Sequence, residues 1–311
     1  MNEAFLAIIN PAAGGGRGRD RVAGALDRLR KSGLAIETVE TNAVGDATRL
    51  ARQAYARGYR KFIAVGGDGT SYEIVNGLFP DCLNAAGDPA AQIPSLAFLP
   101  LGTGNSFLRD FSDPKAADRG LEYATRALET QNSRNCDVLR LTHKQRQLYY
   151  INLASVGFAA DVAAMRHRRF LWLGHAGYFL AIFVCLAQLK RRPLPLRVNG
   201  AGEFDLRPCL FLTFNNSKFT GGTMMIAPDA ATDDGLIEYV RWGPIGRLGL
   251  IRNLHTLYDG THTKHPLAER KAVKSVEFRL NGPVDVMIDG EVLTLEIQTI
   301  DVLPSALRVV V

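Results

Sequence analysis

A chain of 311 residues with 47% hydrophobic and 22% charged side chains is long enough for two domains and apolar enough for an ample core, which excludes a disordered protein. Its net charge of +6 permits anionic partners such as a nucleotide, a nucleic acid or an acidic membrane surface. The four cysteines form no CxxC pair and the six histidines show no zinc-binding spacing, so neither disulfides nor a structural zinc ion are expected. The first residues lack the basic and long apolar regions of a signal peptide, and a cytoplasmic location is expected.

The first part of the chain, to about residue 130, alternates between strand-like and helix-like patterns. Segments with helical spacing, ended by Gly33 and Gly58, separate apolar runs that we predict to be strands, at 4–9, 34–39, 61–65 and 95–99. Alternation with short connections predicts a parallel sheet with right-handed crossovers. Residues 1–135 are therefore predicted to form an α/β domain.

The pattern changes after about residue 135. Short β runs separated by turn residues follow, from CDVLRL at 136–141 to ALRVVV at 306–311. They predict a second domain over 136–311, mostly antiparallel and with the character of a β-sandwich. The last strand either belongs to this domain or returns to the N-terminal one.

One apolar segment interrupts these β runs. Residues 170–189 contain no Asp, Glu, Lys or Arg, and a helix is predicted at about 165–191. Three interpretations stay open: a helix buried in the second domain, a helix lying on a membrane, and a membrane span, for which the length suffices. His175, Gln188 and two glycines argue against a span. The flanking basic residues, each able to contribute about 1 kcal/mol at an anionic leaflet, are Arg166, Arg168, Arg169, Lys190, Arg191 and Arg192.

Glycine-rich loops follow three of the predicted strands, at 10–18, 66–70 and 102–106. The sequence contains no GxxxxGK[ST] motif, and a GxGxxG motif fails because Arg19 stands where its third glycine would be. In an open α/β sheet, loops at the carboxyl ends of the strands meet at one edge and bind ligands there. Together the three loops indicate a nucleotide site.

The GGDGT loop at 66–70 places an aspartate among three glycines. One interpretation is a tight turn in which Asp68 or Thr70 caps the following helix. The other is a phosphate-binding loop, in which glycines let the backbone approach the phosphates and helix N–H groups attract them. A Mg²⁺ ion would then lie between Asp68 and the phosphates.

Five motifs occur in this order across nearly the whole chain: NPAAGGGRG, VGGDGTSYEIVNG, PLGTGNSF, FNNSKFTGGTMMIAPDAATDDGLIEY and IDGEVLT. With them the sequence resembles the bacterial diacylglycerol kinase-like lipid kinases, relatives of sphingosine and ceramide kinases. The GGDGT loop alone is shared with NAD kinases and phosphofructokinases, whereas the glycine pair before APDAATDDG and the late DGE are specific for lipid kinases. The resemblance implies an N-terminal domain of the NAD kinase and phosphofructokinase type, a C-terminal β domain, and a cleft between them where ATP and lipid meet.

The resemblance also implies site residues. Asp68 would act on a catalytic Mg²⁺ in a network that includes Asp137. A separate structural Mg²⁺ would be held by Asp234 and by the carbonyl oxygens of Ala231 and Leu236, because oxygen ligands suit a hard cation; without the family, DDGL is typical of a plain β-turn. The implied ATP site consists of Asn10, Pro11, Ala12, Ala13, Gly14, Thr41, Gly66, Gly67, Asp68, Gly69, Thr70, Ser71, Tyr72 and Thr103.

Two acidic residues near the C-terminus are candidates for the general base that accepts the proton of the lipid hydroxyl. The run VDVMIDGEVLTLEI is typical of a β-hairpin with Asp-Gly in its turn, so Asp289 is either a turn former or the base, and Glu291 is the alternative base. Ser106 departs from the family's commoner motif GTxND, which has an aspartate at this place. One carboxylate of the Mg²⁺ network is therefore missing, and the number of catalytic metal ions stays open.

The expected activity is transfer of the γ-phosphoryl group of ATP to a hydroxyl of a lipid alcohol, with diacylglycerol, phosphatidylglycerol and sphingoid lipids as open alternatives. Two other functions stay open: a soluble NAD kinase-like enzyme, and a catalytically impaired regulator that binds nucleotide or lipid, as Ser106 suggests. The expected partners are the lipid and an anionic membrane surface, contacted peripherally. A homodimer is an open alternative, and nucleic acid is not expected.

Overall fold

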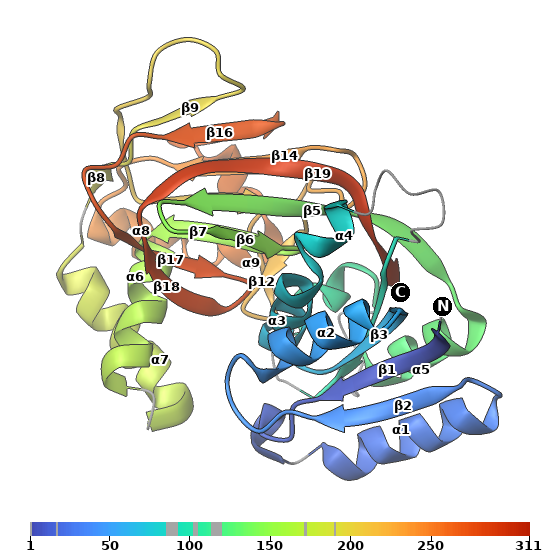
Figure 1. The fold of residues 1–311 in the computed structure, drawn as a ribbon. Coiled ribbons are helices and arrows are strands. Elements are labelled where there is room, and N and C mark those ends of the chain that lie inside the picture. The colour runs from blue at the N-terminus through green and yellow to red at the C-terminus, as the bar shows by residue number, and fades with distance from the viewer. Residues whose placement is uncertain are drawn as a thin grey trace. The chain divides into compact units, whose positions relative to one another are not determined.

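The computed structural model describes residues 2–16, 18–84, 93–101, 105–112, 120–170, 173–189 and 191–311 (Figure 1). By its internal contacts the chain divides into two units. Unit 1 consists of Met1–Val138 and Pro304–Val311, and unit 2 consists of Leu139–Leu303. Two long strands, β5 (Ser133–His143) and β19 (Ile297–Val310), begin in one unit and end in the other.

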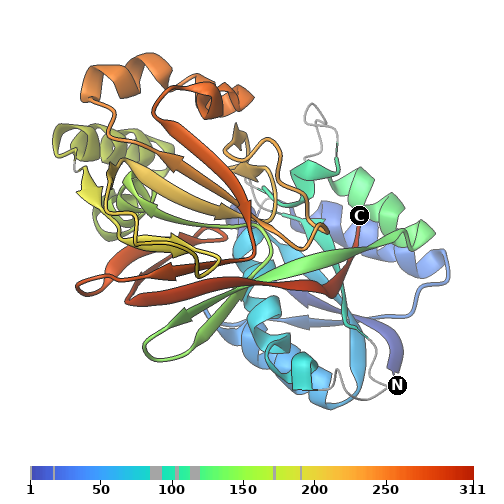
Figure 2. The same cartoon turned by 90° about the horizontal axis from the view of Figure 1, so that it is seen from above.

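Unit 1 is built on a parallel sheet with helices on both faces, which confirms the predicted α/β fold. Its strands are ordered β2 (Ile36–Glu40), β1 (Asn2–Ile9), β3 (Tyr59–Gly66), β4 (Ser95–Pro100) and the end of β19, and all neighbours are parallel. Helix α1 (Arg19–Lys31) packs with α5 (Leu121–Thr130), and α2 (Asp46–Ala56) packs with α3 (Asp68–Leu78) on the other side of the sheet (Figure 2). The shorter elements are η1 (Ala13–Gly16), α4 (Asp81–Asn84) and η2 (Leu108–Asp110).

In unit 1, apolar spacing determines which face of a helix is buried, and one side chain links helices α2 and α3. The buried residues of α1 fall on one face, as helical spacing predicts: Val22, Ala25, Leu26 and Leu29. The Glu73 carboxylate of α3 accepts the backbone N–H groups of Gly45 at 2.8 Å and Ala47 at 3.0 Å. Because these N–H groups lie at the start of α2, Glu73 caps that helix and fixes it against α3.

Unit 2 contains an antiparallel sheet, in agreement with the predicted β-rich domain. Its order is β15 (Ala268–Val273), β14 (Ile237–Trp242), β11 (Phe211–Asn215), β7 (Leu153–Gly157), β17 (Val284–Ile288) and β18 (Glu291–Leu295). Strand β16 (Ser275–Phe278) pairs with β9 (Leu196–Val198) and with the first part of β19, and β6 (Gln147–Tyr150) pairs with β5. The two short pairs are β8 (Arg192–Pro193) with β10 (Pro208–Cys209) and β12 (Phe219–Thr220) with β13 (Met224–Met225).

The apolar segment predicted as one helix has a more divided structure. Helix α6 (Phe158–Met165) continues into a π-helical turn, η3 (Arg166–Phe170), and α7 (Gly174–Ala187) follows. Ala181 and Cys185 of α7 are buried against α6, while Leu180 and Phe183 are exposed. In the part of the chain that the structure describes, no helix is long and apolar enough to cross a membrane. The remaining helices of unit 2 are α8 (Arg247–Asn253), α9 (Thr256–Asp259) and η5 (Thr261–Lys264).

Candidate active site

The carboxyl ends of the parallel strands bring several predicted nucleotide-binding residues to one edge of the unit 1 sheet. Asn10, directly after β1, donates its backbone N–H to the carbonyl of Val65 in β3 at 2.9 Å. Leu101, directly after β4, donates to the carbonyl of Gly66 at 2.8 Å, and Thr41, directly after β2, donates to the end of β1 at 2.9 Å. The loops after these strands therefore start from neighbouring points, as a shared ligand edge requires.

The turn after β1 contains consecutive glycines, so few side-chain atoms cover its backbone. The Asn10 side chain accepts the backbone N–H of Ala12 at 3.0 Å, which bends the chain away from the strand. Gly14 and Gly15 follow with φ of +61° and +66°, a left-handed conformation that glycine adopts without steric cost. Such a turn lets a phosphate group approach the backbone closely.

The GGDGT loop joins β3 directly to α3. A Cβ atom on Gly66 would lie 2.2 Å from Oγ1 of Thr70, so only glycine fits this turn. The N-cap residue of α3 is Gly67, and no side chain among the described residues caps the helix. The interpretation of Asp68 or Thr70 as the capping residue is therefore wrong. Backbone N–H groups at an uncapped helix start are suited to bind anions.

The Asp68 carboxylate turns to the loop after β4, and this contact explains why it does not cap its own helix. Its Oδ2 accepts the backbone N–H of Ser106 at 3.0 Å. Burial raises the pKa of Asp68 above its usual value, and hydrogen bonds from the Ser106 backbone and hydroxyl and from the Phe107 backbone oppose this rise. A hollow of about 20 Å³, room for about one water molecule, borders Gly66, Gly67, Asp68, Ser71, Asn105 and Phe107. Phe98, Pro100 and Leu108 also line this hollow, so its wall is mostly apolar and the Asp68 carboxylate is the oxygen ligand that suits the predicted Mg²⁺ ion there.

Ser106 supplies hydrogen-bond donors to Asp68 where the commoner family motif has an acid. Its side chain is buried, and both its hydroxyl and its backbone N–H contact the Asp68 carboxylate. An aspartate here would bring a second negative charge against Asp68, which serine avoids. The side chains at positions 68 and 106 therefore carry at most one negative charge in this protein, and not two.

Two further residues, Asp137 and Thr103, are predicted for the nucleotide and metal site. Asp137 is fully buried in β5, and its Oδ1 accepts the backbone N–H of Ser305 in β19 at 2.7 Å. Its membership of a network with Asp68 stays a prediction. Thr103 lies outside the described residues.

The predicted ligands of the structural metal lie in the turn before β14 of unit 2. Oδ1 of Asp234 accepts the backbone N–H of Leu236 at 2.9 Å, the contact of a plain Asx-turn. Burial raises the pKa of Asp234, and the charge of Asp233 raises it further, against the effect of the Leu236 hydrogen bond. No group of three His, Cys, Asp or Glu side chains in the described ranges could hold a metal. An ion here would therefore need backbone oxygens, and the carbonyls of Ala231 and Leu236 stay the predicted ones.

The predicted hairpin near the C-terminus is confirmed. Strands β17 and β18 are paired from Ile288 and Glu291 outward, and Asp289 and Gly290 form the two-residue turn between them. Their φ angles of +47° and +92° are those of a type I′ turn, which Asp-Gly favours.

Asp289 is also anchored to a segment far away in the sequence. Its side chain is only 2% exposed. Oδ1 accepts the backbone N–H groups of Asn152 at 3.2 Å and Leu153 at 2.9 Å, and Oδ2 accepts that of Ile151 at 3.1 Å. Both carboxylate oxygens thus bind backbone donors at the start of β7. Glu291, two residues on, is exposed.

A cavity of about 220 Å³ in unit 2 was not predicted from the sequence. Arg168 forms a bidentate ion pair with Asp285, at 3.0 and 2.7 Å, and Arg192 pairs with Asp161 at 2.7 Å. In the sequence, the apolar segment 170–189 is the feature that points to this cavity. Asp161 and Asp285 lie outside that segment, and no local sequence pattern relates them to the two arginines. The walls combine Phe158, Met165 and Cys185 with Asp161, Arg168 and Asp285.

Comparisons with known proteins agree with this architecture. Residues 4–141 match the diacylglycerol kinase catalytic domain, and residues 152–311 match the YegS C-terminal NAD kinase beta sandwich-like domain. A diacylglycerol kinase of Staphylococcus aureus (strain MRSA252) is 30% identical over 297 residues, which cover 94% of this chain and 87% of that protein.

Solved structures show the same fold. The crystal structure of a diacylglycerol kinase from Bacillus anthracis str. Sterne superposes with a TM-score of 0.70 at 18% identity, over 99% of this chain and 96% of the other. A second structure from this organism gives a TM-score of 0.77 at 20% identity, over 99% and 95% of the two chains. At this level of identity the two structures support the fold alone. With the domain matches and the Staphylococcus relative, however, the conclusion is plain: the chain belongs to the diacylglycerol kinase family and is a lipid kinase, a phosphotransferase whose catalytic domain uses ATP.

Proposed function

We propose that this lipid kinase transfers the γ-phosphoryl group of ATP to a hydroxyl of a lipid alcohol of the diacylglycerol, phosphatidylglycerol or sphingoid class. The observation that carries the proposal is the GGDGT turn, where an uncapped helix start adjoins a carboxylate of raised pKa. N–H groups of this kind suit phosphates, and the carboxylate suits their metal ion. The proposed ATP contacts are those of Asn10–Gly14, Thr41, Gly66–Tyr72 and Thr103.

Phosphoryl transfer asks the protein mainly for positioning and for compensation of charge. Mg²⁺, when bound, supplies positive charge to the phosphate oxygens. Asp68 would hold it, directly or through a water molecule in the adjoining hollow, and Asp137 would belong to the same network. In unit 2, Asp234 and the carbonyls of Ala231 and Leu236 would hold a structural Mg²⁺ away from the chemistry.

The contacts of the hairpin favour Glu291 as the general base. A base needs a carboxylate oxygen within hydrogen-bond reach of the hydroxyl that it deprotonates. Asp289 is only 2% exposed, whereas Glu291 lies exposed at the start of β18, where a substrate hydroxyl can reach its side chain. We therefore assign proton acceptance to Glu291 and the positioning of its turn to Asp289.

The cavity between α6 and α7 is the proposed entrance for the lipid. Its apolar wall suits acyl chains, and its charged groups suit the polar end of a lipid alcohol. Because the substrate is a membrane lipid, we propose reversible association of a cytoplasmic enzyme with an anionic membrane surface through the basic flanks of the apolar segment. Arg168 and Arg192 are held in ion pairs within unit 2, so fewer of these charges contribute than the sequence predicts.

The decisive experiment offers labelled ATP with Mg²⁺ and a panel of diacylglycerol, phosphatidylglycerol, sphingosine and ceramide, with NAD⁺ as a further acceptor. A phosphorylated lipid, identified by mass and absent with Asp68→Asn, supports the proposal. Phosphorylation of NAD⁺ alone would indicate an NAD kinase-like activity. ATP binding without any phosphorylated lipid would indicate an impaired regulator.

A further inference from the structure

Helix α8 carries an apolar face that the core of unit 2 does not use. Leu248 is 70% exposed and Ile251 is 55% exposed, and the two lie one turn apart on the same side of the helix. Leu250 points the other way and packs into a buried cluster with Trp242 and with Leu257 of α9. The helix is therefore held firmly by its inner face, while its outer face presents large apolar side chains to solvent.

Helix α7 presents a face of the same kind. Phe183 is 66% exposed and Leu180, one turn before it, is 41% exposed. Ala181 and Cys185 lie on the opposite side and are buried against α6. Two separate helices of unit 2 thus expose apolar side chains that their own packing does not require.

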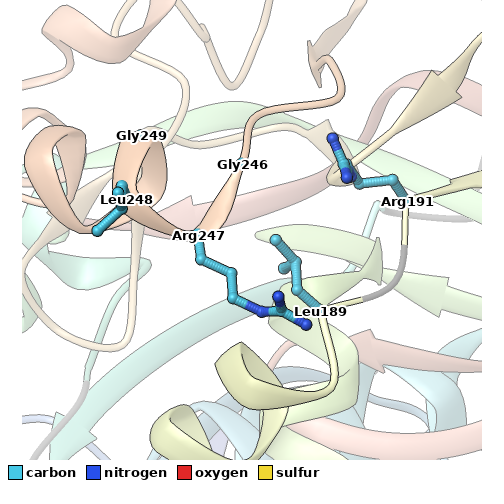
Figure 3. Close-up of a pocket in the computed structure, with 6 residues that line it drawn as sticks. All are labelled: Leu189, Arg191, Gly246, Arg247, Leu248 and Gly249. Atoms are coloured by element: carbon cyan, nitrogen blue, oxygen red, sulfur yellow. The ribbon is translucent and has the colours of Figure 1, made fainter.

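Arg247 joins the two helices. Its Nε and Nη2 donate to the last carbonyl groups of α7, those of Leu186 at 3.0 Å and Ala187 at 2.8 Å. In Figure 3 its side chain extends from the start of α8 to Leu189, with Arg191 on the other side of an open groove. The groove has a volume of about 410 Å³ and is lined by Leu189, Arg191, Gly246, Arg247, Leu248 and Gly249.

The acidic side chains at the border of this region, Asp161 and Asp285, are paired with Arg192 and Arg168. Residues 162–202 and 239–258 contain no aspartate or glutamate. Arg191 borders the groove, and Arg252 is exposed on α8 beside Ile251. Exposed leucine, isoleucine and phenylalanine among arginines, without acids, are the composition of helices that lie in the interface of an anionic bilayer.

We propose that α8, together with the end of α7, docks on an anionic phospholipid leaflet. Leu248 and Ile251 enter the boundary of the acyl chains, Arg252 contacts lipid phosphates, and the groove between Arg191 and Arg247 takes a headgroup phosphate. The inference rests on the proposed function only in that a lipid substrate comes from a bilayer. It adds α8, which is distant in sequence from the apolar segment, to the basic flank that contains Arg191.

Sedimentation of the full chain with vesicles tests this surface. The vesicles contain phosphatidylcholine alone or mixed with phosphatidylglycerol. The double variant Leu248→Ser/Ile251→Ser should bind the mixed vesicles about tenfold more weakly than the parent, or worse, because two inserted side chains are lost. Leu206→Ser is the matched control, since Leu206 is a comparably exposed leucine elsewhere in unit 2. Arg191→Gln should weaken binding about fivefold, and Arg21→Gln, on an exposed face of α1, should not.

Three results would overturn the proposal. The first is parental binding by the double variant, or an equal loss in Leu206→Ser. The second is release of the vesicles by inorganic phosphate at constant ionic strength, which would indicate a site for the free anion. The third is a dimeric parent and a monomeric double variant that still binds vesicles as the parent does, which would make the face a contact between copies.

Vesicle binding needs no turnover, so the two proposals fail separately. If no lipid of the panel is phosphorylated but the variants lose binding, the docking surface stands without the proposed activity. If lipids are phosphorylated and the variants bind as the parent does, the proposed activity stands without this surface.

Discussion

Replacement of Asp289 by asparagine exchanges one carboxylate oxygen for an NH₂ group and tests what this residue does. The remaining oxygen can still accept the N–H groups of Asn152 and Leu153. The NH₂ group then faces the N–H of Ile151, which donates to Oδ2 at 3.1 Å in the parent. Two donors cannot form a hydrogen bond, so the substitution leaves a buried N–H without its acceptor.

The size of the effect follows from these contacts. A hydrogen bond to a charged group contributes about 1.5–3 kcal/mol, and a neutral one about 1 kcal/mol. One charged bond is lost and two become neutral, so the free energy of unfolding of unit 2 should fall by about 3 kcal/mol or more. For a unit of this size, such a loss lowers Tm by roughly 6–12 °C. Asparagine also favours a type I′ turn, so local turn preference alone would predict no loss.

Thermal melts and single-turnover kinetics of two matched variants make the test. Glu291→Gln is the same chemical change two residues on, at an exposed position, and should keep the parental Tm while kcat falls by about 10²–10⁴-fold. Asp289→Asn should lose stability first, with a smaller effect on kcat below its Tm. If Asp289→Asn melts as the parent does and loses kcat by that factor while Glu291→Gln stays active, Asp289 is the base and Glu291 is not.

Three further outcomes are expected. Asp234→Ala should abolish the rise in Tm that Mg²⁺ gives the parent, because an ion bound only by the folded state stabilises it; an unchanged response would remove Asp234 from the metal site. Ser106→Asp should lower the Tm of the metal-free protein, since a second carboxylate would face Asp68, and Mg²⁺ should restore it; equal melting without Mg²⁺ would contradict this contact. Burial lowers the pKa of His262 below its usual 6.5, against the opposing effect of the Thr256 and Ile226 carbonyl oxygens, which lie 3.2 and 3.1 Å from its ring nitrogens. Below pH 6.5 the unfolded chain therefore binds a proton more readily than the folded state does. Stability is therefore complete above pH 6.5 and falls below it, by up to about 1.4 kcal/mol per pH unit. Melts in acid should cost the parent more than His262→Gln, and parallel curves would count against a buried neutral imidazole.

Local patterns predicted those parts of the structure that depend on neighbours in the sequence. Helical spacing located the buried face of α1, and Asp-Gly located the turn between β17 and β18. The loops after successive strands could be placed at one sheet edge because parallel strands share their polarity.

Contacts between distant segments could not be predicted in this way. The interpretation of the GGDGT loop as a turn capped by Asp68 or Thr70 was wrong for Asp68 because a loop of another strand donates the Ser106 N–H to its carboxylate. The partners of Asp289 lie near residue 152, on a strand to which its own strand pairs only in the folded sheet. The ion pair of Arg168 with Asp285 joins the π-helical turn η3 to the same hairpin, and the local sequence of neither segment predicts it.

The path of β19 has a consequence for the order in which the protein is made. Residues Arg308–Val310 complete the unit 1 sheet beside β4, whereas the rest of unit 1 ends at Val138. At usual translation rates, the intervening unit takes roughly ten to thirty seconds to emerge from the ribosome. During that time β4 is an edge strand with unpaired backbone N–H and C=O groups. Such an edge can pair with another nascent chain, which leads to aggregation. The time needed to synthesise unit 2 therefore sets how long this edge of unit 1 stays unpaired.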